Sequence, residues 1–208
     1  MHQVKVFEEK NTQVLFDLIQ NHRLGTLVTS FEGELDANHI PFEVIEQPNS
    51  FGLLRAHIAK ANPLYQQLLE HKDTSVLVIF QSDNAYISPN WYPEKVIHHK
   101  VVPTWNYMVV HIKGKLRLIE DQEQLLEILK NLTHQEEAKL SQTTPWQVSD
   151  APQDYLDQML KYIVGIEVEI TEMTGKFKIS QNKNAETIST VQQALATTHP
   201  IMSSKMKG

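Results

Sequence analysis

The sequence predicts a mainly β fold, an antiparallel barrel with peripheral helices. Short apolar runs bounded by turn signals follow one another, and no strand–helix–strand rhythm or internal repeat is visible. The clearest single pattern is residues 166–170, where apolar residues alternate with glutamates as in a half-buried antiparallel strand. With 208 residues, 41% of them hydrophobic, the chain can build one large domain or one domain with an appendage.

The first half of the chain begins with a helix and continues with strands. Residues 8–21 are predicted to be helical because Val14, Leu15, Leu18 and Ile19 recur at helical spacing. Asn62-Pro63 predicts the start of a short helix that ends near residue 71. Pro41 lacks an N–H for a ladder, so it is expected at a sheet edge or a bulge. Strands are expected at residues 25–29, 35–45, 51–58, 74–81 and 85–88.

The second half adds a long strand, helices and a last strand. Residues 105–119 have a strand pattern with an expected break at Gly114. Capping-box patterns at Asp121–Gln124 and Thr133–Glu136, with a third start signal at residues 150–153, predict helices. A final helix is expected at 185–196, with a loose tail from residue 197. The domain boundaries that follow are 1–182, with a helical insert at about 121–162, and a C-terminal helix and tail at 183–208.

Composition excludes several classes of function. The chain has no cysteine, which excludes disulfides and thiol catalysis and fits a reducing cytoplasm. No apolar run approaches the length of a membrane span, and no secretory signal is visible. The net charge of −6 and the lack of a basic recognition helix make direct DNA binding doubtful.

Two aromatic segments are the most informative part of the chain. Residues 86–93 and 102–107 hold two of the three tryptophans, three of the six tyrosines and three of the nine prolines. Interleaved with them are polar residues that can hydrogen-bond. A rigid loop of flat faces and directed polar groups suits a planar polar ligand, although aromatics that only close the edge of a core would look the same.

A cationic segment precedes the first aromatic one. Arg55 and His57 point the same way along a strand, and Lys60 and Asn62 lie where that strand should end and a helix begin. Such a group could hold a phosphate, with help from the backbone N–H groups of the helix start, or could be a solvated rim.

Other chemistries have weak signals. The ten histidines include no metal-binding motif, and adjacent strand residues such as His98 and His99 point to opposite faces, so no metal site is expected. No hydrolase, phosphate-loop or dinucleotide fingerprint is present. Residues 176–182 are a compact polar run that either guards a strand edge with lysines or completes a site across a dimer interface.

Taken together, these segments resemble the PaiB family, FMN-binding split-barrel proteins described as negative transcriptional regulators. The resemblance runs from about residue 7 to residue 182, with shared order and spacing. It departs at the start, where the family has Met-Tyr and a nearby proline but this chain has His2 and Val4. The matching pieces lie at residues 26–29, 35–42, 56–63, 85–92, 102–107, 110–111, 146–152 and 176–182.

The resemblance implies a split β-barrel of the flavin-reductase kind, a homodimer, and FMN in a groove between two subunits. It identifies no catalytic residue. The cations of the strand end would bind the phosphate, the aromatic rings would stack on or flank the isoalloxazine, and the remaining polar groups would bind its edge. The candidate cofactor-binding residues are Arg55, His57, Lys60, Asn62, Ser88, Trp91, Tyr92, Thr104, Trp105, Asn106, Lys178 and Gln181.

Three functions remain open from the sequence. The first is an FMN-binding transcriptional regulator. The second is a flavin-dependent oxidoreductase acting on a small molecule, whose regulatory effect would be indirect. The third is a split barrel without flavin that serves as an interaction or small-ligand module.

Overall fold

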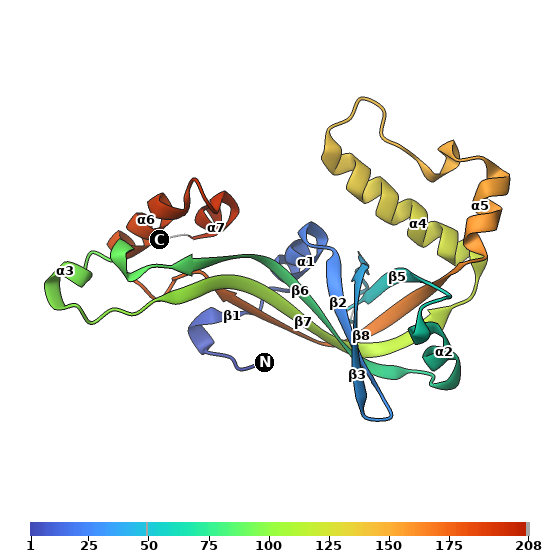
Figure 1. Ribbon diagram of the computed structural model, residues 1–208, viewed down its shortest axis with the longest axis horizontal. Helices are drawn as coiled ribbons and strands as arrows, with labels where there is room; N and C mark the ends of the chain where they lie inside the picture. Colours follow the sequence, from blue (N-terminus) through green and yellow to red (C-terminus); the bar gives the residue numbers. More distant parts are fainter. Residues whose placement is uncertain (49, 207–208) are drawn as a thin grey trace. The chain divides into compact units, whose positions relative to one another are not determined.

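The computed structural model describes residues 1–48 and 50–206. The described strands form one eight-stranded sheet in the order β3-β2-β6-β7-β8-β5-β4, with β1 paired to β8 outside this path. All the strand registers that the structure defines are antiparallel. The predicted fold class, an antiparallel split-barrel type with peripheral helices, is confirmed (Figure 1).

The chain divides into two compact units. Unit 1 comprises residues 1–22, 80–111 and the chain from 174 onward; unit 2 comprises residues 23–79 and 112–173. Three long strands contribute residues to both units, because the chain passes from one unit to the other within them. These strands are β6 (Thr74–Ile87), β7 (Thr104–Ile119) and β8 (Ile163–Lys178).

Unit 1 is built mostly from helices and the ends of the long strands. The N-cap Asn11 accepts a hydrogen bond from the backbone of Gln13, and the helix that follows buries one apolar face. The predicted helix at 8–21 therefore begins later, after a two-residue strand. The further elements are η1 (Lys5–Phe7), β1 (Glu8–Glu9), α1 (Thr12–Asn21), η2 (Pro89–Trp91), α3 (Lys95–His98), α6 (Ala185–Leu195) and α7 (Pro200–Lys205).

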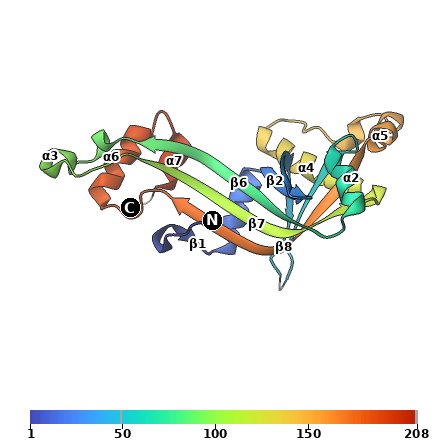
Figure 2. The ribbon, with the colours of Figure 1, turned by 60° about the horizontal axis from the view of Figure 1, so that its bottom comes forward.

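Unit 2 contains the remaining strands and helices. Pro41 ends β3, which lies at one edge of the sheet, as its missing N–H predicts. Helix α4 packs on β4 and β5, and α4 and α5 lie beside each other in both views (Figures 1 and 2). The further elements are β2 (Leu24–Phe31), β3 (Glu34–Pro41), β4 (Glu43–Ile45), β5 (Leu53–Ala59), α2 (Pro63–Glu70), α4 (Gln122–Glu137), η3 (Ala138–Leu140), η4 (Val148–Asp150) and α5 (Gln153–Leu160).

Three local expectations were wrong. Gly114 does not break β7; a Cβ at this position would clash with the backbone oxygen of Glu169, so the glycine permits close strand packing. Thr133 and Glu136 lie inside α4, because the apolar periodicity carries the helix through the apparent capping box. The tail is not loose where the structure describes it, since α7 forms and buries Met202; residues 207 and 208 lie outside the described residues.

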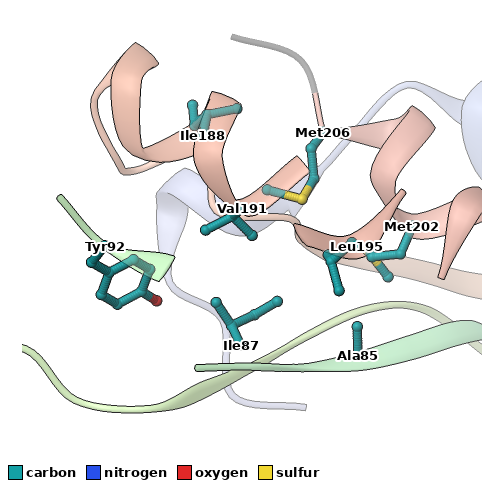
Figure 3. Close-up of a cluster of buried hydrophobic side chains, with 8 residues drawn as sticks. All are labelled: Ala85, Ile87, Tyr92, Ile188, Val191, Leu195, Met202 and Met206. Atoms are coloured by element: carbon teal, nitrogen blue, oxygen red, sulfur yellow. The ribbon is translucent and has the colours of Figure 1, made fainter. Parts of the chain in front are cut away.

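The core of unit 1 joins strand, loop and C-terminal helices. Figure 3 shows side chains of α6 and α7 pointing toward those of β6 and toward Tyr92. The cluster buries about eight side chains from segments a hundred residues apart, which ties the C-terminal helices to the aromatic segment. Its members are Ala85, Ile87, Tyr92, Ile188, Val191, Leu195, Met202 and Met206.

Candidate functional site

Four of the twelve candidate residues lie in unit 2, at the end of β5 and the start of α2. Leu54, Ala56 and Ile58 are buried on one face of β5. The intervening Arg55 and His57 therefore share the other face, as the strand period predicts. The structure thus brings these two side chains to one side of the sheet.

Arg55 already has a partner. Its Nε donates to Oε2 of Glu167 at 2.7 Å, directly across from it on β8. The other oxygen of Glu167 accepts from Arg117, whose Nε lies 3.0 Å away. One buried carboxylate thus joins two guanidinium groups, and the pKa of Arg117 is raised by its hydrogen bond to Glu167.

An open pocket of about 400 Å³ adjoins this charge group. Arg55, Arg117 and Glu167 contribute to its wall, together with residues at the start of α4 such as Asp121 and Gln124. Basic and acidic groups are mixed along this wall, so the pocket is polar without a single sign of charge. Asp121 also caps α4 by accepting from the backbone of Gln124, as the sequence predicts.

The other three residues of this group differ in availability. Burial lowers the pKa of His57, and its Nδ1 is buried without a hydrogen-bond partner. The amide of Asn62 is engaged at both ends, since its oxygen caps α2 at the backbone of Leu64 and its nitrogen donates to Asn38. Lys60 is exposed and borders a small pocket of about 100 Å³.

Unit 1 holds the other eight candidates, three of them around η2. Ser88 begins the short helix by accepting a hydrogen bond from the backbone of Asn90. Trp91 is half-buried against the core cluster of unit 1. Tyr92 is only 3% exposed and belongs to that cluster, and the ammonium of Lys183 lies 4.8 Å from the centre of its ring.

Three candidates lie side by side at the start of β7, and they differ sharply. Trp105 is 52% exposed, whereas the following Asn106 is completely buried. The amide of Asn106 exchanges hydrogen bonds with the hydroxyl of Ser180 and contacts the sulfur of Met206. Thr104 accepts a hydrogen bond from Lys178.

The last two candidates are Lys178, the final residue of β8, and Gln181 just after it. Burial lowers the pKa of Lys178, and the neighbouring charge of Lys176 lowers it further. The side chain of Gln181 spans three backbone groups: its oxygen accepts from Ile179, and its nitrogen donates to Val6 and Phe177. The structure therefore joins Thr104 to Lys178, while Gln181 joins the N-terminal segment at Val6 to the end of β8.

Two relevant residues were missed by the sequence reasoning. Tyr86 packs edge-on against Trp105, with ring centres 5.8 Å apart and planes at 72°. Its alternation with Ala85 and Ile87 was a usable signal that it points away from the core. Glu167 was assigned to a solvent-facing row, yet it is only 3% exposed because two arginines neutralise it.

The described residues contain neither a group of metal-ligating side chains nor a helix that could span a membrane. Within residues 1–48 and 50–206, no three histidine or acidic side chains gather as metal ligands would. None of the described helices combines the length and the apolar composition that crossing a membrane requires.

Comparison with known proteins identifies the family. The model of the family described as "Putative FMN-binding domain" matches residues 1–172, and the chain belongs to this family. It is 31% identical over 184 residues to the protease synthase and sporulation protein PAI 2 of Bacillus subtilis, covering 88% of this chain and 84% of that one. It is 36% identical over 208 residues to the uncharacterized protein AN0679 of Emericella nidulans, covering 85% and 82%. The predicted kinship with the PaiB family is therefore confirmed, and FMN is the cofactor of the family's description.

Solved structures share the fold at low sequence identity. The conserved hypothetical protein Rv2991 of Mycobacterium tuberculosis has a TM-score of 0.61 at 14% identity, covering 88% of this chain and 94% of that one. The FAD- and heme-binding protein of Mycobacterium smegmatis has a TM-score of 0.57 at 15% identity, covering 88% and 79%.

Proposed function

We propose that this protein binds FMN. The candidates for the phosphate are cations of unit 2, and the candidates for the ring are aromatic and polar groups of unit 1. The observation that carries the proposal is the family match, whose residues 1–172 include ten of the twelve candidates, all but Lys178 and Gln181. When bound, FMN supplies a flavin that can accept and release electrons.

The cations of unit 2 fit a phosphate. Lys60 offers an exposed basic side chain just before α2, where an anion could reach it. His57 offers a buried ring nitrogen that lacks a partner within the described residues. Arg55 can take part while it remains bound to Glu167, because a guanidinium has five donors.

The groups of unit 1 fit a flat polar ring. Trp105 presents an exposed aromatic face, and the adjacent Thr104 is hydrogen-bonded to Lys178. A cation at this place would favour the electron-rich carbonyl edge of a flavin and its reduced anion. Asn106 and Gln181 already spend their hydrogen bonds inside the protein, so we assign them to holding the site and not to contacting the ring.

We also propose that the protein acts as a homodimer in a regulatory role. Large apolar side chains of unit 1 are exposed at Val96, Ile97 and Val102, as on a surface that another chain covers. The regulatory role is extended from the B. subtilis relative named for protease synthesis and sporulation. A net charge of −6 argues for an indirect effect in which direct DNA binding is weak, and the cysteine-free composition keeps the cytoplasm as our expected location.

The central test is a titration of the purified protein with FMN and with riboflavin, which lacks the phosphate. We expect Lys60→Ala to weaken FMN binding about ten- to a hundredfold and to leave riboflavin binding unchanged. Trp105→Ala should weaken the binding of both FMN and riboflavin. Lys72→Ala, an exposed lysine in a turn, is the matched control and should bind like the parent.

Each outcome has a definite meaning. A parent that binds neither ligand contradicts the proposed function and favours a flavin-free interaction module. If Lys60→Ala and Trp105→Ala both bind FMN like the parent, the assigned groups are the wrong ones. Bleaching of a bound flavin by NAD(P)H would favour the oxidoreductase over the regulator.

Assembly and DNA binding are tested separately. Sedimentation at micromolar concentration should give a dimer, and a monomer would contradict the proposal. Specific DNA binding below about 1 μM at physiological salt would contradict the indirect role.

A further inference from the structure

The end of the β6–β7 ribbon has two different faces. On β6, Ala85 and Ile87 are completely buried, whereas Tyr86 between them is 46% exposed. On β7, Asn106 is completely buried and the preceding Trp105 is 52% exposed. Because successive strand residues point to opposite faces, Tyr86 and Trp105 lie on the face turned away from the core.

The buried face is held by the C-terminal segment, residues 183–206, which lies beyond the family model. Figure 3 shows Val191, Leu195 and Met202 of this segment directed toward the strand that carries Ala85 and Ile87. The hydroxyl of Thr190 donates to the backbone oxygen of Trp91 at 2.8 Å, and Met206 contacts the amide of Asn106. This packing fixes the backbone that carries the exposed pair.

The exposed face carries two aromatic rings in a defined arrangement. The rings of Tyr86 and Trp105 meet edge to face, at 5.8 Å between centres and 72° between planes. Such pairs are favourable because the positive edge of one ring meets the negative face of the other. The pair is thereby oriented in advance, while about half of each side chain remains open to a ligand.

We infer that Tyr86 and Trp105 together form the ring-binding surface of this protein, and that Tyr92 and Asn106 act only as positioning residues behind it. The inference rests on the proposed FMN binding and adds Tyr86, which lies in the predicted aromatic segment but is not among the twelve candidates. The occupant is the flat isoalloxazine of a flavin. An exposed aromatic surface suits a planar ring, and the family match gives a flavin as its occupant.

The test separates ring binding from phosphate binding. We expect Tyr86→Ala to weaken the binding of FMN and of riboflavin by the same factor, about 5- to 100-fold. Loss of one aromatic stacking partner has an effect of this size in proteins that stack nucleic-acid bases. Tyr86→Phe keeps the ring and should bind both ligands like the parent. The matched control is Tyr155→Ala, which removes a tyrosine that is 54% exposed on α5.

A second measurement does not depend on a truncated side chain. In a protein carrying Trp91→Phe and Trp146→Phe, the emission comes from Trp105 alone, and riboflavin binding should quench it. Thermal unfolding and circular dichroism of every variant check that the fold is retained.

The results distinguish this inference from the function on which it rests. If the parent binds FMN but Tyr86→Ala binds both ligands as tightly as the parent does, the ring lies elsewhere and the inference is overturned. The same holds if bound riboflavin leaves the emission of Trp105 unchanged. A parent that binds neither flavin removes the proposed function itself, and the inference falls with it.

Discussion

In unit 2 the candidate Arg55 is held in place by charge, whereas in unit 1 the candidate Tyr92 is held by apolar burial. Arg55 is bound to Glu167, which also binds Arg117. Tyr92, by contrast, lies in an apolar cluster beneath α6 and α7. The difference shows that a candidate residue can be occupied in two ways, by an ionic partner that a ligand can share or by a core that a ligand cannot enter.

The largest expected effect concerns the charge group of unit 2. Glu167→Gln should lower the free energy of unfolding by about 2–4 kcal/mol, because two arginines lose the buried carboxylate that joins them. Denaturant unfolding at pH 7 measures this. The control is Glu172→Gln, whose exposed ion pair with Lys113 should contribute less than about 1 kcal/mol. Equal effects of the two substitutions would show that unit 2 is not held by charge.

An intermediate effect is expected at Glu43 on β4, which lies directly opposite Arg55 on β5. Burial raises the pKa of Glu43, although the nearby side chain of Asn131 and the charge of Arg55 offset part of this. As the pH rises, the Glu43 carboxyl therefore ionises first in the unfolded chain. The stability that this carboxyl contributes falls as the pH rises from its pKa in the unfolded chain through its pKa in the folded protein. Glu43→Gln should stabilise the protein by about 1–2 kcal/mol at pH 7 and by less near about pH 4.

The measurement for Glu43 is a series of unfolding curves across that pH range. Glu123→Gln on α4 is the control, because Glu123 is an exposed glutamate that is not among the groups that shift the pKa of Glu43. A gain that is equally large at both pH values would mean that Glu43 does not titrate in this window.

The smallest effect is expected where the C-terminal segment meets the aromatic loop of unit 1. The hydroxyl of Thr187 and the amide of Asn184 both donate to Glu94, and the hydrogen bond from Thr187 is the main cause of the lowered pKa of Glu94. Its contribution to stability is present above the unfolded pKa and is lost as pH falls through the folded pKa.

Thr187→Val should therefore move the pKa of Glu94 back toward its ordinary value and slightly reduce stability at neutral pH. NMR titration of the Glu94 carboxyl measures the first effect. Thr198→Val, a surface threonine that does not contact Glu94, is the control. An unchanged pKa in Thr187→Val would show that this hydrogen bond does not hold the loop.

Local signals were enough to predict much of the fold. Asn62 and Asp121 cap their helices as expected, because a cap depends only on residues within one turn. Gly114 was misread, since the approach of a neighbouring strand cannot be seen in its own segment.

The candidate residues were less predictable, because their availability depends on distant segments. Asn106 and Trp105 are neighbours with similar sequence signals, yet only Asn106 is covered by a segment a hundred residues later. The contribution of each candidate to flavin binding stays a prediction.

The length of the long strands has a consequence for how this protein tolerates insertions. Strand β6 runs for 14 residues and β7 for 16. In β6 the even-numbered residues from Val76 to Ser82 are buried, and after two exposed residues the odd-numbered Ala85 and Ile87 are buried on either side of Tyr86. Inserting one residue upstream in β6 without a bulge to absorb it would invert the alternation downstream and exchange Tyr86 with its buried neighbours. Two inserted residues would restore it. Whether the number of inserted residues is odd or even, more than how many there are, therefore decides which side chains of the strand meet the solvent.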